Sequence, residues 1–445
     1  MNIAIIGGGI SGLATAFYIK QAQPDTTITL YEKEPTLGGK MHTHEEEGFL
    51  FEEGSNGFLS NKPDTLDLVK ESGAEELLMR SSDHARVRFI YKDSLELLPE
   101  SPGAFLRTPL LTWRGKLRVA KEIFVAPKTD DSDETLQSFG YRRVGQEMTD
   151  AFLDPMVAGV FASAPDKISV GAAFPAVVKL EREYGGLFKG MLAKKKKDAG
   201  PGGVLMSFHG GVSAFIDALA ESMEIEIRTD APVESLTRQD STYTLTANGQ
   251  SDTYDRVILS TPAFVTADLV RDLDAELADQ LDDIEYSPIS VIGLGYEHLD
   301  HDLQGFGLLT TSSANKDVLG VLWDSSIFTD RAPEGKKALR VMIGGQRNPN
   351  LALKSDEELT ALAIQGVKET MGITTPPDIT YVKRWERGIP NYRLGHIARM
   401  EKLFETLERH EGLYLSANAY YGVGLNDCVA NAKKVAEEVI QEGQK

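Results

Sequence analysis

The sequence contains a single cysteine, Cys428, among 445 residues. One thiol excludes an intrachain disulfide, a redox-active dithiol pair and any metal or iron–sulfur site built from several cysteines. The chain also lacks an uncharged apolar run of about 18 or more residues, the length that a transmembrane helix needs. Residues 1–10 lack the basic start of a secretory signal peptide. We therefore expect a cytoplasmic protein whose contact with a membrane is at most peripheral, on the inner face of the cell membrane.

Basic residues are scarce relative to acidic ones. The chain has 47 Lys and Arg against 67 Asp and Glu, which gives a formal net charge of −20. Nucleic-acid binding needs a broad basic face, so we expect no nucleic-acid partner. The 41% of apolar residues is enough to bury two or three hydrophobic cores in a chain of this length. The composition therefore favours a folded protein with several lobes.

The first residues carry a dinucleotide-binding pattern. Residues 2–6 form an apolar run typical of a buried strand, and a glycine-rich turn and a helical pattern follow it. In the GxGxxG spacing, Gly7 makes the tight turn, Gly9 lets the backbone approach a pyrophosphate and Gly12 lets the helix pack closely on the strand. Glu32 follows a second apolar run, 20 residues beyond Gly12. There a carboxylate can accept hydrogen bonds from both ribose hydroxyls.

Further glycine turns favour FAD over NAD as the cofactor. Gly38 and Gly39 form a second glycine pair, and residues 51–57 contain another glycine turn, as an extended ligand would need. Residues 413–438 read as a strand, a glycine-containing turn and a helix, which resembles the closing segment of a glutathione-reductase-type FAD fold. No second GxGxxG occurs in the chain. We therefore expect electrons to come from the organic substrate and not from NADPH.

The remaining patterns suggest a mixed α/β and α+β fold. A β-meander is expected at residues 225–262, β-type runs with glycine turns at 288–345, and helical patterns at 101–200 and 356–371. We predict a Rossmann-like FAD-binding domain, an antiparallel substrate domain and a helical membrane-binding insertion. The predicted ranges are 1–85, 204–265 and 385–445 for the FAD domain, 86–203 for the insertion with part of the substrate site, and 266–384 for the substrate domain.

Residues 101–128 combine basic and apolar side chains. Six basic residues stand against Glu122 alone, a local charge of +5 in an acidic protein. The interleaved leucine, phenylalanine and tryptophan side chains suit an anionic lipid surface. A helical segment that packs on the domain and leaves a solvated basic face would show the same pattern. Both interpretations are open from the sequence.

Other candidate chemistry is weak. His42 and His44 share one face of a predicted strand, but no third ligand is spaced to complete a metal site, so we interpret them as surface histidines and expect no metal. No local pattern indicates a nucleophilic triad. Cys428 falls in the last helical pattern, where covalent flavin attachment is conceivable and a buried structural thiol is the better interpretation.

Several motifs resemble the protoporphyrinogen oxidase family of flavin amine oxidases. They lie at residues 154–162, 168–175, 180–183, 388–396 and 418–428, and the similarity runs essentially from end to end. The resemblance implies an FAD-dependent enzyme of haem biosynthesis that takes six electrons from protoporphyrinogen IX. Three O₂ would be reduced to three H₂O₂ in three two-electron steps. It also implies peripheral membrane contact through residues 101–128 and is compatible with a homodimer.

The resemblance also implies site residues. Hydride transfer to the flavin would need no catalytic side chain, since the meso C–H bonds of a porphyrinogen are weak. Arg88 would pair with a propionate, Asn56 would lie near flavin and macrocycle, and Gly159 would admit the tetrapyrrole. The faces of the macrocycle would pack on Leu309, Leu322 and Met342. The residues expected at FAD are Gly7, Gly9, Ser11, Gly12, Glu32, Lys33, Gly38, Gly39, Lys40, Gly54, Ser55, Asn56, Gly57, Val233, Trp385, Val423, Gly424 and Leu425. Without the resemblance, the three apolar residues would be plain core and Arg88 a surface cation.

The sequence departs from the family at three positions. Ala417, Ser163 and Ser55 stand where the family commonly has glycine, glycine and proline. We expect the methyl group of Ala417 to crowd a turn close to FAD. The departures leave room for coproporphyrinogen III, whose four carboxylates would require more cationic partners than Arg88. Two further classes stay open from the sequence, a flavin oxidase of amines or polyenes and a non-catalytic flavoprotein or porphyrin carrier.

Overall fold

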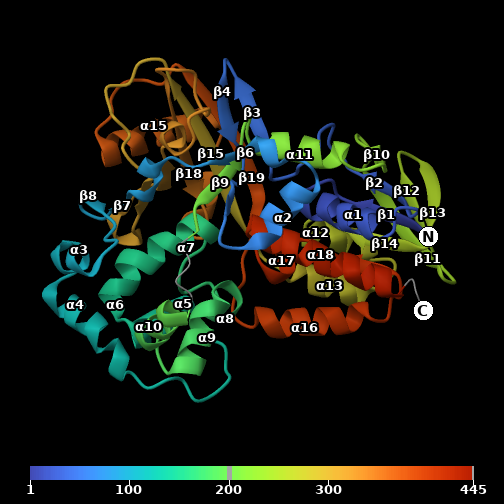
Figure 1. Ribbon diagram of the computed structural model, residues 1–445, viewed down its shortest axis with the longest axis horizontal. Helices are drawn as coiled ribbons and strands as arrows, with labels where there is room; N and C mark the ends of the chain where they lie inside the picture. The colour runs from blue at the N-terminus through green and yellow to red at the C-terminus, as the bar shows by residue number, and fades with distance from the viewer. Residues whose placement is uncertain (198–202, 443–445) are drawn as a thin grey trace.

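A computed structural model describes residues 1–197 and 203–442 of the chain. Two large sheets dominate it, a parallel sheet of five strands and a mainly antiparallel sheet of seven (Figure 1). A group of helices from the 102–197 region lies below the seven-stranded sheet in the same view. The fold is therefore mixed α/β, as the sequence predicted.

The parallel sheet combines strands from the start, the middle and the end of the chain. Its order is β10 (Glu226–Arg228), β2 (Thr27–Tyr31), β1 (Asn2–Ile6), β14 (Arg256–Leu259) and β20 (Leu413–Leu415). All neighbouring strands pair in parallel. Apart from the edge strand β10, the strands are short apolar runs that are almost wholly buried, as expected for a parallel sheet covered on both faces.

Each face of the parallel sheet has its own cover. One face packs against α1 (Ile10–Ala22), α11 (Val212–Glu221) and α18 (Leu425–Glu442), with α2 (Pro63–Glu71) beside them. The other face packs against a meander and three helices, namely β11 (Val233–Gln239), β12 (Thr242–Ala247), β13 (Gln250–Tyr254), α12 (Ala263–Val270), α13 (Ala275–Asp282) and α16 (His396–Leu407). The N-terminus and the end of the C-terminal helix α18 lie at the right of the view in Figure 1.

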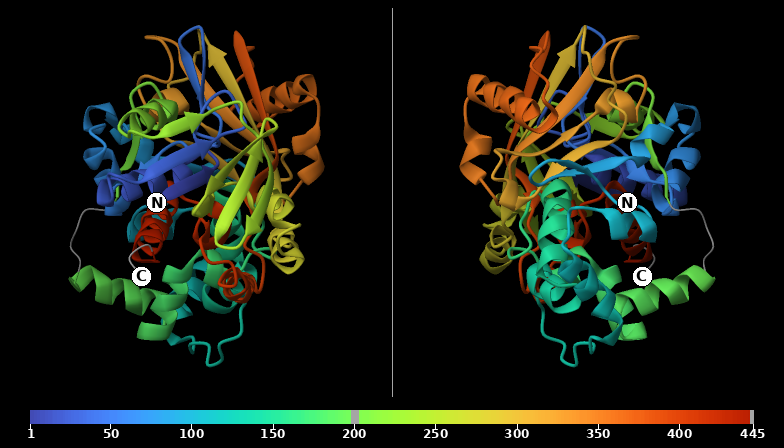
Figure 2. Two further views of the ribbon diagram at one scale, coloured as in Figure 1. Left: turned by 90° about the vertical axis from the view of Figure 1, so that its right-hand side faces the viewer. Right: turned by 90° about the vertical axis from the view of Figure 1, so that its left-hand side faces the viewer.

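The seven-stranded sheet has one covered face and one face turned toward the site. Its order is β19 (Ile379–Pro390), β15 (Tyr286–Tyr296), β18 (Lys337–Gly344), β17 (Val318–Leu322), β16 (Gly307–Thr310), β7 (Arg88–Tyr91) and β8 (Leu95–Leu97). Pairing is antiparallel except between β16 and β7. Helix α15 (Asp356–Met371) packs on one face, which Figure 2 shows from two sides.

Smaller elements connect the two sheets. The hairpin of β3 (Thr43–Glu46) and β4 (Phe49–Glu52) places Phe51 and Phe49 on Gly293 and Gly295 of the seven-stranded sheet. A three-stranded sheet contains β5 (Phe58–Leu59), β9 (Leu205–Phe208) and β6 (Leu78–Arg80). Short helices are α14 (Asp324–Ile327), α17 (Asn418–Tyr421) and the 3₁₀ segments η1 (Glu75–Leu77), η2 (Asp83–Arg86), η5 (Ser312–Ala314) and η6 (Pro349–Leu353).

The helical region is held together by a buried ionic group. Its elements are α3 (Pro102–Arg107), α4 (Trp113–Ala120), η3 (Lys121–Phe124), α5 (Leu136–Arg143), α6 (Gln146–Met148), the π-helical η4 (Thr149–Leu153), α7 (Asp154–Phe161), α8 (Val170–Ala173), α9 (Pro175–Tyr184) and α10 (Leu187–Lys197). Arg143 is fully buried and pairs with Glu122 and, at 3.3 Å, with Glu181. Because the three residues lie on η3, α5 and α9, the pairs join separate helices of this region.

The predicted division of the chain differs from the elements at two places. The boundary at residue 385 cuts β19, which continues to Pro390 within the seven-stranded sheet. Strands β7 and β8 also belong to that sheet, within the 86–203 range that was predicted to hold the insertion and part of the substrate site. Helix α13 falls in the predicted substrate range but packs on the parallel sheet. These differences arise because strand pairing joins segments that are far apart in the sequence.

Among the helices of the described residues, none combines the length and the apolar character needed to cross a bilayer.

Candidate cofactor and substrate site

The β1–α1 turn has the geometry that its glycines predicted. Gly7 has φ +109°, and a Cβ on Gly12 would lie 2.1 Å from the carbonyl oxygen of Gly7, so neither position accepts a larger residue. A Cβ on Gly9 would meet no protein atom closer than 3.8 Å. Protein packing therefore does not explain Gly9, and the free space fits a ligand close to the backbone. Helix α1 begins here without a side-chain cap, which leaves its first N–H groups available to an anion.

Glu32 lies beside this turn at the end of β2. One carboxylate oxygen accepts from the backbone N–H of Gly8 at 2.8 Å, and the other accepts from Glu34 N–H at 3.0 Å. Gly38 N–H donates to the Gly8 carbonyl at 2.9 Å and brings the second glycine pair to the same place. Lys33, in contrast, is exposed and pairs with Glu34 at 3.0 Å, so its side chain points away from the turn.

The loop at residues 54–57 contains a buried and unsatisfied amide. Both polar side-chain atoms of Asn56 are buried, and neither has a hydrogen-bond partner among the described residues. Such groups are costly to leave unsatisfied, so the amide fits a bound polar group. Gly54 packs against the Lys40 carbonyl, where a Cβ would lie 2.4 Å from the oxygen. The predicted cofactor residues at 38–40 and 54–57 are thus in contact.

Lys40 follows the Gly38–Gly39 pair, and its side chain reaches toward β19. Its ammonium group donates to the Gly388 carbonyl and lies 5.5 Å from the centre of the Tyr286 ring. Burial lowers the pKa of Lys40 to about 8. A cation that is partly neutral near physiological pH therefore stands between the predicted cofactor loops and the substrate sheet.

Glu53 directly precedes the 54–57 loop and anchors that loop to β19. Its carboxylate accepts from Tyr381 and pairs with Lys383 at 2.6 Å and with His42 at 3.0 Å. Burial raises the pKa of Glu53, but the bonds from Lys383 and Tyr381 outweigh it and leave the pKa below its usual value. The Glu53 carbonyl accepts from Trp385 Nε1 at 2.8 Å. His42 is a partly exposed residue, with 31% of its side chain accessible, and it also takes part in this network through its pair with Glu53.

The predicted substrate residues form two neighbouring groups on one face of the seven-stranded sheet. Leu309 and Met342 flank Gly320, where a Cβ would lie 2.8 Å and 3.3 Å from their side chains. Gly159 of α7 covers Leu309, with 2.9 Å between a Cβ at 159 and the leucine. Gly159, Leu309 and Met342 therefore come together around a glycine that sequence reasoning did not select.

The second group lies two residues along the strands, on the same face. Leu322 and Arg88 both pair with Gly307, from β17 and β7 respectively. Leu322 packs near Phe306, and the exposed Arg88 guanidinium lies 5.1 Å from the centre of the Phe306 ring. Arg88 is thus a cation at the end of an apolar surface.

The C-terminal cofactor residues precede and begin α18. The predicted turn at 418–424 contains a short helix, α17, and the strand and helix on either side are present. Asn426 Nδ2 donates to the Leu59 carbonyl at 2.9 Å, which joins α18 to the end of the 54–57 loop. Cys428 is buried in α18, and burial raises the pKa of its thiol to about 11. The thiol stays protonated, which supports a structural role.

The family departures have local explanations. Ala417 has φ −147°, an extended backbone that any residue adopts, so its methyl group causes no backbone strain here. Ser163 is buried and donates to Asn391 Oδ1 at 2.9 Å. Ser55 lies within 3.4 Å of the backbone of Gly57 and makes local turn contacts. Val233, at the start of β11, follows Ala231, whose N–H donates to the Glu32 carbonyl at 2.8 Å.

Sequence reasoning missed Gly320, Arg340 and Tyr392. Arg340 is buried on β18 and donates to the Glu52 carbonyl at 2.9 Å, which supports the 54–57 loop. A glycine inside an apolar strand and an arginine inside another were the available signals. Tyr392 lies within the 388–396 motif, but nothing in its sequence spacing indicates its partners.

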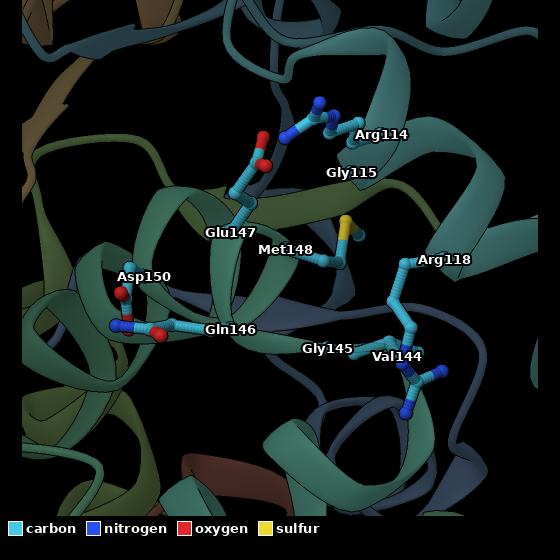
Figure 3. A pocket seen from close by; sticks show the side chains of 9 residues that line it. All are labelled: Arg114, Gly115, Arg118, Val144, Gly145, Gln146, Glu147, Met148 and Asp150. Atoms are coloured by element: carbon cyan, nitrogen blue, oxygen red, sulfur yellow. The ribbon is translucent and has the colours of Figure 1, made fainter.

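A surface cavity of about 350 Å³ lies elsewhere, in the helical region (Figure 3). It is lined by Arg114, Gly115, Arg118, Val144, Gly145, Gln146, Glu147, Met148 and Asp150. None of these residues belongs to the predicted cofactor or substrate set. Within the described part of the chain, no three His, Cys, Asp or Glu side chains are arranged to hold a metal ion.

Comparisons with known proteins identify a family for the chain. The sequence profile described as flavin containing amine oxidoreductase matches residues 10–440. Coproporphyrinogen III oxidase of Bacillus subtilis (strain 168) is 29% identical, covering 99% of this chain and 98% of the relative. Chloroplastic protoporphyrinogen oxidase of Oryza sativa subsp. japonica is 28% identical over 98% of this chain and 88% of its own. A crystal structure from Exiguobacterium sp. 255-15, provisionally named a protoporphyrinogen oxidase, has a TM-score of 0.88 and 29% identity, with 99% of each chain covered.

Proposed function

Because the chain belongs to the flavin-containing amine oxidoreductase family, with FAD as its cofactor, we propose that it oxidises a porphyrinogen with O₂. The bound flavin supplies the hydride acceptor and the route of electrons to oxygen. The observation that carries the proposal is the apolar face around Gly320, next to a loop whose Asn56 amide has no partner among the described residues.

The residues of this face would bind and orient the substrate. Gly159, Leu309 and Met342 offer an apolar surface suited to a flat tetrapyrrole and to the exclusion of water. Arg88 would pair with a propionate at the edge. No side-chain base is required, since the pyrrole nitrogens of a porphyrinogen already favour loss of hydride from the meso carbons. Six electrons would pass to three O₂ and give three H₂O₂.

Two substrates are equally supported. The relatives carry the names coproporphyrinogen III oxidase and protoporphyrinogen oxidase at similar identity. Coproporphyrinogen III has four carboxylates where protoporphyrinogen IX has two. The number of cationic side chains at the opening of the substrate site would therefore decide between the two substrates.

The test uses the purified FAD-loaded protein with both porphyrinogens in parallel. We expect porphyrin fluorescence to rise with at least one of them, with three H₂O₂ released per porphyrin. Absence of fluorescence with both, together with turnover of an amine or a polyene, would replace this proposal with another flavin oxidase activity.

Arg88→Ala refines the test of the substrate site. We expect KM for the preferred porphyrinogen to rise about tenfold, as loss of a charge-assisted hydrogen bond predicts, while FAD content stays unchanged. Arg86→Ala is the matched control, since Arg86 is an exposed neighbour paired with Asp83 at 3.7 Å. An unchanged KM in Arg88→Ala would remove the propionate role.

We also propose a cytoplasmic enzyme that contacts the membrane through residues 101–128. Trp113 is 66% exposed and Phe124 is 82% exposed, and Arg114 and Lys121 are exposed beside them. Not every basic residue of the segment is free, because Lys116 is buried and donates to the Leu106 and Thr108 carbonyls at 2.9 and 2.7 Å. The apolar side chains, more than the charge, therefore support this proposal.

A further inference from the structure

The Tyr392 hydroxyl bridges the two ends of the α17 turn. It donates to the Asn418 carbonyl at 2.6 Å and accepts from the Gly422 N–H at 2.7 Å. The residue is 1% exposed, and burial raises the pKa of its hydroxyl well above the ordinary value. The hydroxyl therefore keeps its proton and both bonds across the physiological pH range.

His396 holds the middle of the same turn. Its ring stacks on Tyr392 with centres 4.1 Å apart, and its Nε2 lies 3.1 Å from the Tyr420 carbonyl. Since a carbonyl can only accept, Nε2 carries the proton and donates. Two neighbouring side chains thus contact the backbone of three turn residues, Asn418, Tyr420 and Gly422.

The segment at residues 391–395, which carries Tyr392 and leads into His396, is itself fixed to the helical region. Asp133 accepts from the Gly395 N–H at 2.8 Å and from the Ser169 hydroxyl at 2.7 Å. Ser169 N–H donates to the Tyr392 carbonyl at 2.7 Å. Hydrogen bonds at the Tyr392 carbonyl and the Gly395 N–H therefore restrain the backbone from which Tyr392 contacts the 418–424 turn.

The 418–424 turn leads directly into α18. This helix lies beside the segments expected to bind FAD, the glycine turn at residues 7–12 and the loop at 54–57, which together form the cofactor cradle. Helix α18 begins at Leu425, and its second residue, Asn426, bonds to Leu59 beyond the 54–57 loop. Along the same helix, Cys428 is buried in the core that α18 shares with α1, the helix that begins in the glycine turn. The first turn of α18 thus joins two segments that bind the cofactor, and its position depends on the 418–424 turn.

We propose that Tyr392 is a positioning residue that fixes the 418–424 turn, and with it the first turn of α18, in the arrangement that binds flavin. The inference rests on the flavin of the proposed function and is independent of which porphyrinogen is oxidised. Tyr392→Phe removes the hydroxyl and leaves the Asn418 carbonyl and the Gly422 N–H without their partner, while the ring stack on His396 stays.

The experiment compares Tyr392→Phe with wild type in FAD affinity and flavin reduction potential. We expect the FAD dissociation constant to rise about tenfold, because two buried backbone groups lose their partner. We also expect the reduction potential to become more negative, since a displaced helix N-terminus stabilises the reduced, anionic flavin less. Neither measurement needs a porphyrinogen, so failure of the substrate assignment would leave the result intact.

Tyr243→Phe is the matched control. Tyr243 is a fully buried tyrosine of β12 whose hydroxyl donates to the Glu411 carbonyl at 2.9 Å, away from α18. We expect its potential to equal that of wild type. Equal FAD affinity and equal potential in Tyr392→Phe and Tyr243→Phe would overturn the proposal.

A second variant covers the case in which Tyr392→Phe does not fold. His396→Ala removes the bond to Tyr420, and hydrogen exchange of residues 418–424 in the holoenzyme reports on the turn. Faster exchange there than in β12, with a more negative potential, supports the proposal. Unchanged exchange and potential would overturn it.

Discussion

His396 makes the stability of the protein sensitive to acid. Burial lowers its pKa to about 4 in the folded state, whereas an unfolded histidine titrates near about 6.5. The unfolded chain therefore binds more protons between these values. The stabilisation from neutral His396 is complete above the pKa of the unfolded state. It is lost as the pH falls through the pKa of the folded state.

We expect the free energy of unfolding to fall by about 3 kcal/mol between pH 6.5 and 4 through this residue. Chemical denaturation across that range measures it, with His396→Gln as the comparison because Gln keeps a donor for Tyr420 but does not titrate. An equally steep pH dependence in His396→Gln would assign the effect to other groups.

Gly12 should tolerate no side chain. Because a Cβ there would lie 2.1 Å from the Gly7 carbonyl, Gly12→Ala must move the β1–α1 turn. We expect the purified variant to contain no FAD, measured as flavin absorbance per protein after incubation with excess FAD. Gly103→Ala is the control, since nothing lies within 4 Å of its Cβ position in α3. Normal flavin content in Gly12→Ala would contradict the role of this glycine.

At the residue scale, the geometry of the glycine turn was predicted correctly because it depends on local spacing. Gly7, Gly12 and Glu32 act over a single turn or a pair of adjacent strands, so their order in the chain is informative. Tyr392 acts on residues 26 and 30 positions away. Its partners depend on tertiary folding, which sequence spacing does not encode.

At the scale of elements, the stability of the helical region depends on the buried ion pairs of Arg143. Glu122 pairs with Arg143 and also accepts from the Leu187 N–H at 2.8 Å, at the start of α10. Removing the carboxylate would leave Arg143 buried and without this partner. Such a loss costs about 3–5 kcal/mol.

We therefore expect Glu122→Ala to lower the free energy of unfolding by about that amount in chemical denaturation. Glu183→Ala, which removes an exposed pair with Lys179 at 3.6 Å, should change it by less than about 1 kcal/mol. Similar effects of the two variants would show that the buried group contributes no more than the exposed one.

Elements with local signals were predicted well. Helix α15 coincides with the expected 356–371 because Ser355 and Glu358 form a capping box and Gly372 ends the helix at φ +73°. Strand β19 was not anticipated, since its pairing with β15 requires a strand almost one hundred residues earlier. The α17 helix was read as a turn because it lasts four residues.

At the scale of the whole molecule, the exposed apolar edge of α4 and η3 predicts membrane partitioning. We expect the double variant Trp113→Ser and Phe124→Ser to bind anionic phospholipid vesicles at least about tenfold more weakly, since two large side chains would no longer be buried in the interface. Vesicle sedimentation measures the change. Leu353→Ser is the control, as Leu353 is 50% exposed at the end of η6. Equal partitioning of both variants would place the contact elsewhere.

The parallel sheet has a consequence for biosynthesis. Its central strand β1 is synthesised some 250 residues before its partner β14, and β20 follows only near residue 413. A nascent chain shorter than this exposes the unpaired edge of β14 and has no α18 to close the cofactor cradle. We therefore expect flavin to bind only after β20 and α18 have been synthesised, since the parallel sheet and the cofactor site both need them.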